Sequence, residues 1–155
     1  SLKIIGWTTV LFGILLYFSD KSDNEKSLEI NLDIKSALII GVLHVFSLVP
    51  GVSRSGIAIT AARFLKFDRV NAARISFLLS IPTLLAVSVY GIYNIYLTES
   101  FNIIKLNFSS IIFSFIFSYI TMVAFLGYIK KASLDVFVLY RVVLGVLILI
   151  FAYQG

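Results

Sequence analysis

One Pro-Gly-Val-Ser-Arg-Ser-Gly segment holds the residues of this chain that are best suited to chemistry. Pro50 and Gly51 stop a helix and let the backbone turn. Ser53 or Ser55 can cap the helix that follows, because its first N–H groups have no partner within the helix. Arg54 adds a planar, permanently charged group that can bind two phosphate oxygens at once. Two hydroxyls, free N–H groups and a guanidinium at a helix N-terminus predict a phosphate-binding site.

The composition places this segment in a membrane protein. Of 155 residues, 59% are hydrophobic and 14% charged, with a formal net charge of +5. These values exclude a disordered tail and a coiled coil. The absence of cysteine excludes a disulfide framework, a thiolate catalyst and a cysteine metal site. The cations stand in short loops between apolar runs, which indicates contact with lipid headgroups and no nucleic-acid partner.

Four apolar runs predict membrane-spanning helices, because ~20 helical residues cover the ~30 Å hydrocarbon core. They cover residues 2–18, 75–97, 108–129 and 134–153. The polar stretch from Ser19 to Lys35 is expected to be a solvated loop.

Residues 36–65 do not fit one crossing. A helix over 36–49 would be ~21 Å long and one over 56–65 ~15 Å, each about half a bilayer. The segment is therefore predicted to be a re-entrant helix–turn–helix hairpin with the Pro50–Gly51 turn at its tip. Non-helical backbone at that depth requires a surrounding protein or water-filled cavity, so we expect Arg54 to face a buried polar cavity.

The distribution of Lys and Arg favours the re-entrant arrangement. With a re-entrant hairpin, Lys3 and Lys105 lie on one side of the membrane and nine cations on the other. The positive-inside rule then places these nine in the cytoplasm. They are Lys21, Lys26, Lys35, Arg63, Lys66, Arg69, Arg74, Lys130 and Lys131.

Other polar residues have simpler explanations than chemistry. Arg74 and Arg141 lie near span ends, where arginine side chains reach the headgroups, so membrane anchoring is favoured for both. Ser76, Ser80 and Ser88 are expected to bond the preceding helical turn or to allow close helix packing. An Arg54 without a function is disfavoured, because inserting an arginine at the centre of a membrane helix costs ~2.5–3.5 kcal/mol of free energy on insertion scales.

Three blocks in this order closely resemble the undecaprenyl-diphosphate phosphatase (bacitracin-resistance) family: 50–56 (PGVSRSG), 71–82 (NAARISFLLSIP) and Tyr140–Arg141. The resemblance implies an all-α polytopic fold of two inverted repeats, of which this chain is the second. It also implies a multi-pass enzyme of the bacterial inner membrane. This hydrolase releases phosphate from undecaprenyl diphosphate, recycling the carrier lipid for peptidoglycan synthesis.

The resemblance also assigns roles to residues. Arg54, Ser53 and Ser55 would be catalytic. The expected substrate-binding residues are Pro50, Gly51, Gly56, His44 and Thr60. A divalent cation, Mg²⁺ or Ca²⁺, would be held mainly by glutamates of the first half, outside this chain. Two positions depart from the family pattern: His44 stands where the family usually has Gln, and the family threonine falls on Ala58, with Thr60 nearby.

The carboxylates agree with a chain that provides half of a site. They all fall in loops or at span ends: Asp20, Asp23, Glu25, Glu29, Asp33, Asp68, Glu99 and Asp135. Residue 1 is Ser, and the motif of the family's first half, paired glutamates followed by a Pro-Ser-Ser-Thr-Gly-His turn, is absent. We therefore expect the chain to be part of a longer protein and inactive by itself.

Three other functions remain open. A transporter or flippase would bind an anion at Arg54 without cleaving it, and a structural membrane subunit would not need Arg54. A phosphatidic-acid-type phosphatase needs two histidines, whereas the chain has one. The expected partners are a polyprenyl diphosphate lipid and the bilayer, and a homodimer is left open.

Overall fold

The protein is all-α, as predicted. The computed structural model describes residues 1–21, 26–97 and 101–154, without the side chains at 95, 97 and 101–108. An isolated bridge between Lys26 and Phe67 is the one β-type pairing among the described residues. The elements are α1 (Leu2–Asp20), α2 (Leu28–Asn31), α3 (Ile34–His44), the 3₁₀ helix η1 (Val45–Leu48), α4 (Arg54–Phe64), α5 (Arg69–Leu97), α6 (Phe101–Ile129) and α7 (Asp135–Gln154).

Four helices are long and apolar enough to cross a membrane, namely α1, α5, α6 and α7. They confirm the four predicted spans, although α1 extends to Asp20 and α5 begins at Arg69. Charged residues are poor indicators of where these two helices end, because Asp20 and Arg69 both belong to helices and form an ion pair with each other. The chain forms two compact units, Ser1–Leu79 with Ala132–Gly155 and Ser80–Lys131, and each is described by itself.

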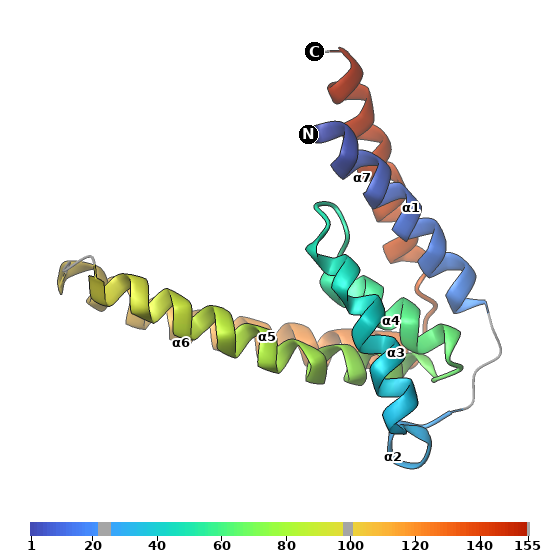
Figure 1. Ribbon diagram of the computed structural model, residues 1–155, viewed down its shortest axis with the longest axis horizontal. Coiled ribbons are helices and arrows are strands. Elements are labelled where there is room, and N and C mark those ends of the chain that lie inside the picture. The colour runs from blue at the N-terminus through green and yellow to red at the C-terminus, as the bar shows by residue number, and fades with distance from the viewer. Residues whose placement is uncertain (22–25, 98–100, 155) are drawn as a thin grey trace. The chain divides into compact units, whose positions relative to one another are not determined.

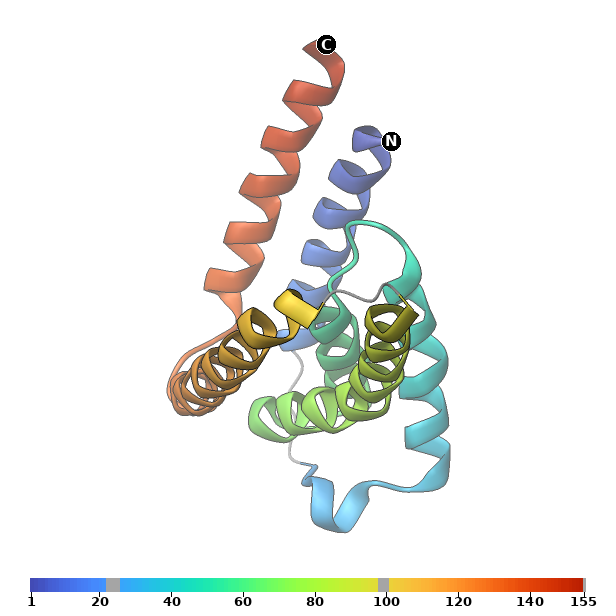
Figure 2. The same cartoon turned by 90° about the vertical axis from the view of Figure 1, so that its left-hand side faces the viewer.

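In the first unit, α1 and α7 run antiparallel and side by side (Figures 1 and 2). Small residues allow this close approach. A Cβ atom on Gly145 would lie 2.6 Å from the Val10 side chain and 3.1 Å from the Gly6 carbonyl oxygen. A Cβ atom on Gly6 would in turn lie 3.3 Å from the Gly145 carbonyl oxygen. Paired small residues are a common way for membrane helices to pack.

We expect Gly145→Ala to lower the thermal unfolding midpoint of the full-length protein in detergent by a few degrees. The added methyl group would push α1 away from α7, which outweighs the gain of about 1 kcal/mol in helix propensity. Gly127→Ala is the matched control, because nothing lies within 4 Å of a Cβ atom there. Equal midpoints for the two variants would show that the glycine contact does not hold α1 against α7.

The predicted helix–turn–helix is present at residues 34–64. α3 and η1 lead to a turn at 49–53, and α4 returns beside α3 (Figure 1). Asp33 caps α3 by accepting a hydrogen bond of 2.9 Å from the Ser36 backbone N–H. Hydrogen bonds from the Ser36 side chain and backbone also hold the pKa of the Asp33 carboxyl below its usual range. The re-entry of this hairpin from one side of a membrane remains a prediction.

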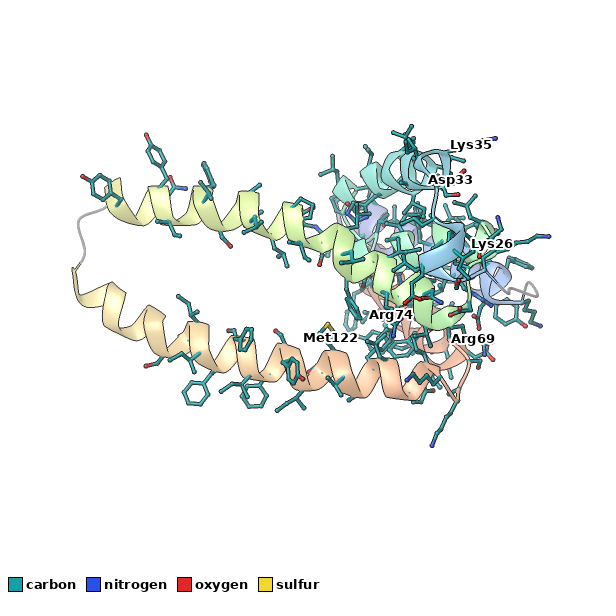
Figure 3. The ribbon with its side chains drawn as sticks, turned by 90° about the horizontal axis from the view of Figure 1, so that it is seen from below. Lys26, Asp33, Lys35, Arg69, Arg74 and Met122 are labelled. Carbon is teal, nitrogen blue, oxygen red and sulfur yellow. The ribbon has the colours of Figure 1, made fainter. Side chains whose placement is uncertain are left out.

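Two predicted loops are wrong in part. Ser19 and Asp20 belong to α1 and are buried, while residues 28–31 and 34–35 are helical, so the described part of this stretch is only partly loop. Arg63, predicted to stand among the cations of cytoplasmic loops, is buried on α4, and the connection between α4 and α5 covers only residues 65–68. Figure 3 shows Lys26 on the segment before α3 and Lys35 in the first turn of α3.

The described side chains of α6 in the second unit are largely exposed. Phe113, Phe115 and Phe117 are each more than 60% exposed. An apolar surface of this kind is expected where a helix contacts lipid or another part of a membrane protein. The side chains of Lys105 and Phe108, used in the sequence predictions, lie outside the described residues, as do Asp23, Glu25 and Glu99.

Candidate functional site

The tip of the hairpin forms the predicted helix N-terminus. Of the two candidate capping residues, Ser53 caps α4, and its Oγ accepts a hydrogen bond of 3.1 Å from the Gly56 N–H. The Ser55 hydroxyl lies 3.3 Å from the Ser53 hydroxyl. Arg54 is the first residue of α4. The partial positive charge of the helix end and both hydroxyls therefore occupy one small region.

Helix α1 contacts the turn from one side. The Thr8 hydroxyl lies 2.7 Å from the Pro50 carbonyl oxygen, and the Thr9 hydroxyl lies 3.2 Å from that of Gly51. Each hydroxyl has one proton and also lies near carbonyl oxygens of its own helix, at 2.8 Å for Thr8 and 2.6 Å for Thr9. These contacts place the carbonyl groups of the turn toward α1.

Arg141 of α7 contacts the same turn, and this position corrects the predicted membrane anchor. Its side chain is buried, with the residue 9% exposed, and its Nη2 donates a hydrogen bond of 3.1 Å to the Gly51 carbonyl oxygen. A Cβ atom on Gly56 would lie 2.6 Å from Arg141 Nη1, so the guanidinium group lies directly against the start of α4. Gly56 leaves room for it.

Positive charge gathers at the turn without a compensating carboxylate. The two ion pairs found among the described residues involve Arg63 and Arg69, so Arg141 has no carboxylate partner there. A buried cation beside a helix N-terminus favours binding of an anion, because the guanidinium group and the helix end both carry positive charge. The sequence held one sign of this role for Arg141. The residue lies about two turns inside an apolar helix, where an arginine without a partner costs free energy in a membrane.

Gly51 is required for this geometry. Its φ of +93° lies in the region that disfavours residues with a side chain. A Cβ atom there would overlap the Thr8 hydroxyl and lie 2.6 Å from the Ile5 carbonyl oxygen.

We expect Gly51→Ala to lower the affinity of the full-length protein for inorganic phosphate about tenfold or more, because the turn must move away from α1 and Arg141. Phosphate binding is measured against Gly41→Ala, whose added Cβ atom has nothing within 4 Å. Unchanged affinity in Gly51→Ala would show that the turn tolerates another geometry.

The remaining predicted residues differ in position. Arg54, expected in a buried cavity, is exposed in the described chain. Pro50 is exposed and Gly56 is buried. His44 ends α3, and its Nδ1 is buried without a hydrogen-bond partner among the described residues.

Two further hydroxyls donate hydrogen bonds to backbone carbonyl groups in the first turn of α4. Thr60 is buried inside α4 and donates a hydrogen bond of 2.8 Å to the Gly56 carbonyl oxygen, so its proton is not directed at a ligand. Ser76 of α5 donates to the Ser55 carbonyl oxygen at 3.3 Å rather than to the preceding turn of its own helix. Ser76 thereby holds α5 against the first turn of α4.

The described residues do not provide a metal site. Nowhere in the described ranges do three His, Asp or Glu side chains gather closely enough to hold a metal ion. The groups at the turn are donors and cations, which fit phosphate oxygens rather than a metal.

Comparison with known proteins assigns the chain to a family. Residues 1–147 match the family model described as bacitracin resistance protein BacA. A protein of Pelagibacter ubique named undecaprenyl-diphosphatase is 47% identical over 154 residues, covering 99% of this chain and 60% of the relative. Relatives of the same name from Jannaschia and Campylobacter curvus are 35% and 42% identical, with 57% and 55% of their lengths covered.

The chain thus spans somewhat more than half the length of these relatives. The match extends over all of the elements that form the hairpin tip and its contacts with α1, α5 and α7. Together with the four apolar helices, it identifies a multi-pass protein of the bacterial inner membrane that belongs to the BacA bacitracin resistance family.

Proposed function

We propose that the full-length protein containing this chain hydrolyses undecaprenyl diphosphate to undecaprenyl phosphate and phosphate. The observation that supports this most strongly is the buried Arg141 guanidinium against the N-terminus of α4, beside the Ser53 and Ser55 hydroxyls. The names of the relatives point to the same reaction. Such an enzyme would recycle the carrier lipid for peptidoglycan synthesis, as expected of a bacitracin resistance protein.

Each group at the hairpin tip has a proposed role. Arg54 binds the diphosphate with its planar fork and stabilises the charge on the phosphoryl group during its transfer to water. Ser53, Ser55 and the first N–H groups of α4 donate hydrogen bonds to phosphate oxygens. Arg141 supplies a second positive charge from the protein side of the turn. His44 is proposed as a further polar contact with the diphosphate.

A divalent cation, Mg²⁺ or Ca²⁺, is part of this proposal, with ligands from outside this chain. When bound, it would neutralise charge on the diphosphate. The polyprenyl chain would lie along apolar helix faces.

Phosphate release separates this function from its main alternative. A carrier is the second candidate, because a helix N-terminus at a hairpin tip is also used to bind anionic cargo in transporters. Purified full-length protein is given undecaprenyl diphosphate with Mg²⁺ or Ca²⁺, and free phosphate is measured. Steady release supports the hydrolase. Movement of the lipid between leaflets of a vesicle without release would favour the carrier.

A further inference from the structure

A buried cluster of charges lies at the other end of α4, away from the turn. The side chains of Asp20 and Arg63 are 3% and 5% exposed, and that of Arg69 is 35% exposed. Asp20 Oδ1 lies 3.1 Å from Arg63 Nη2. Arg69 binds both carboxylate oxygens of Asp20, at 2.8 Å through Nε and 2.9 Å through Nη2. No step of the proposed reaction uses these groups.

The cluster joins four helices. Asp20 ends α1, Arg63 lies in the last turn of α4, and Arg69 begins α5. Asp20 Oδ2 also accepts a hydrogen bond of 3.1 Å from the backbone N–H of Leu134, which directly precedes α7. The backbone oxygen of Asp20 accepts a further bond of 2.6 Å from Arg63 Nη2. One acidic residue therefore fixes the ends of α4, α5 and α7 relative to α1.

Stability alone does not explain such a cluster. Replacing a buried ion pair by well-packed apolar residues is often neutral or stabilising. Apolar side chains, however, tolerate sliding and rotation, whereas a two-bond contact between Arg and a carboxylate is satisfied in one geometry. Buried polar groups are best attested as devices that set the register of helices.

The register of α4 matters at its opposite end. Along α4, ~14 Å separates Arg63 from Arg54, and a shift of one residue moves a helix by ~1.5 Å and rotates it by ~100°. Such a shift would remove Gly56 from Arg141 and the turn from Thr8. α1 and α7, which carry Thr8 and Arg141, also bind the cluster.

We propose that Asp20 is a positioning residue, which sets the register of α4 against α1 and α7 and thereby places the anion site at the hairpin tip. This inference rests on the proposed function only for its effect on catalysis. Its effect on the position of the hairpin does not depend on the reaction.

Two conservative variants of the full-length protein test the proposal. Asp20→Glu keeps the charge but lengthens the side chain by one methylene group. Arg69→Lys keeps the charge but loses the two-bond contact, at a partly exposed position. Asp135→Asn is the matched control, because it removes an exposed carboxylate close to the cluster.

The first measurement is the distance between nitroxide labels on Leu11→Cys of α1 and Leu48→Cys of η1, in a background without other cysteines. Both leucines are exposed. We expect Asp20→Glu and Arg69→Lys to shift or broaden the distance distribution, and Asp135→Asn to leave it unchanged.

The second measurement is phosphate release from undecaprenyl diphosphate. We expect kcat to fall about tenfold in Asp20→Glu, with a smaller change in KM, because misplaced groups lose contacts with the transition state first. An unchanged distance distribution in both folded variants would overturn the proposal, whatever happens to kcat. Should Asp20→Glu fail to fold, Arg69→Lys alone decides. A shifted distribution with no phosphate release even from the unmodified protein would support the positioning role and refute the proposed reaction instead.

Discussion

Full-length protein carrying Arg54→Ala is expected to release phosphate from undecaprenyl diphosphate about two orders of magnitude more slowly, or worse. The reason is the place of Arg54 as first residue of α4, where its guanidinium adds a full charge to the partial charge of the helix end. Without it, the charge on the transferred phosphoryl group loses its strongest partner at the tip. The measurement is kcat/KM for phosphate release, together with thermal unfolding.

The unfolding measurement makes this prediction specific. Arg54 is exposed and no hydrogen bond of its side chain is found among the described residues, so Arg54→Ala should leave the unfolding midpoint unchanged. Arg74→Ala is the matched control, because Arg74 is also exposed, on α5. It should retain normal activity if it serves as a membrane anchor. A loss of activity below about threefold for Arg54→Ala would favour a structural role for the whole segment.

Arg141→Met is expected to lower phosphate release by a similar factor of about 100. Unlike Arg54→Ala, this substitution also changes contacts that hold the turn. Methionine keeps much of the length of the side chain but removes its charge and its bond to the Gly51 carbonyl oxygen. The loss of that bond costs about 1–3 kcal/mol if the carbonyl group stays buried. Removing a buried cation without a carboxylate partner acts in the opposite direction, so the net change in stability should be small.

Arg141→Lys separates the two contributions of Arg141. Lysine keeps the positive charge but cannot donate to the Gly51 carbonyl oxygen and to a phosphate with a planar fork. We therefore expect activity between that of the unmodified protein and that of Arg141→Met. Activity equal to the unmodified protein in Arg141→Met, with phosphate binding intact, would return Arg141 to the role of a membrane anchor.

The sequence by itself determined the helices and the turn. Apolar length predicted all four spanning helices, because a helix must satisfy its own backbone groups in lipid. Pro50 and Gly51, with too little apolar length on either side for a crossing, predicted the helix–turn–helix. Ser53 was correctly among the two candidate capping residues, since capping depends on neighbours within three residues.

Only the tertiary structure decided which polar groups meet. Arg141 is 90 residues from Gly51, and Asp20 is 114 residues from Leu134. Near the end of an apolar helix, an arginine that reaches the headgroups and one that enters a buried turn have the same local sequence. The choice depends on which helix lies alongside, and this is set by close packing of Gly6 against Gly145 and by the contacts of Asp20 with the ends of α4, α5 and α7. Periodicity along the chain specifies the face of a helix, whereas the neighbour of that face is a property of the folded protein.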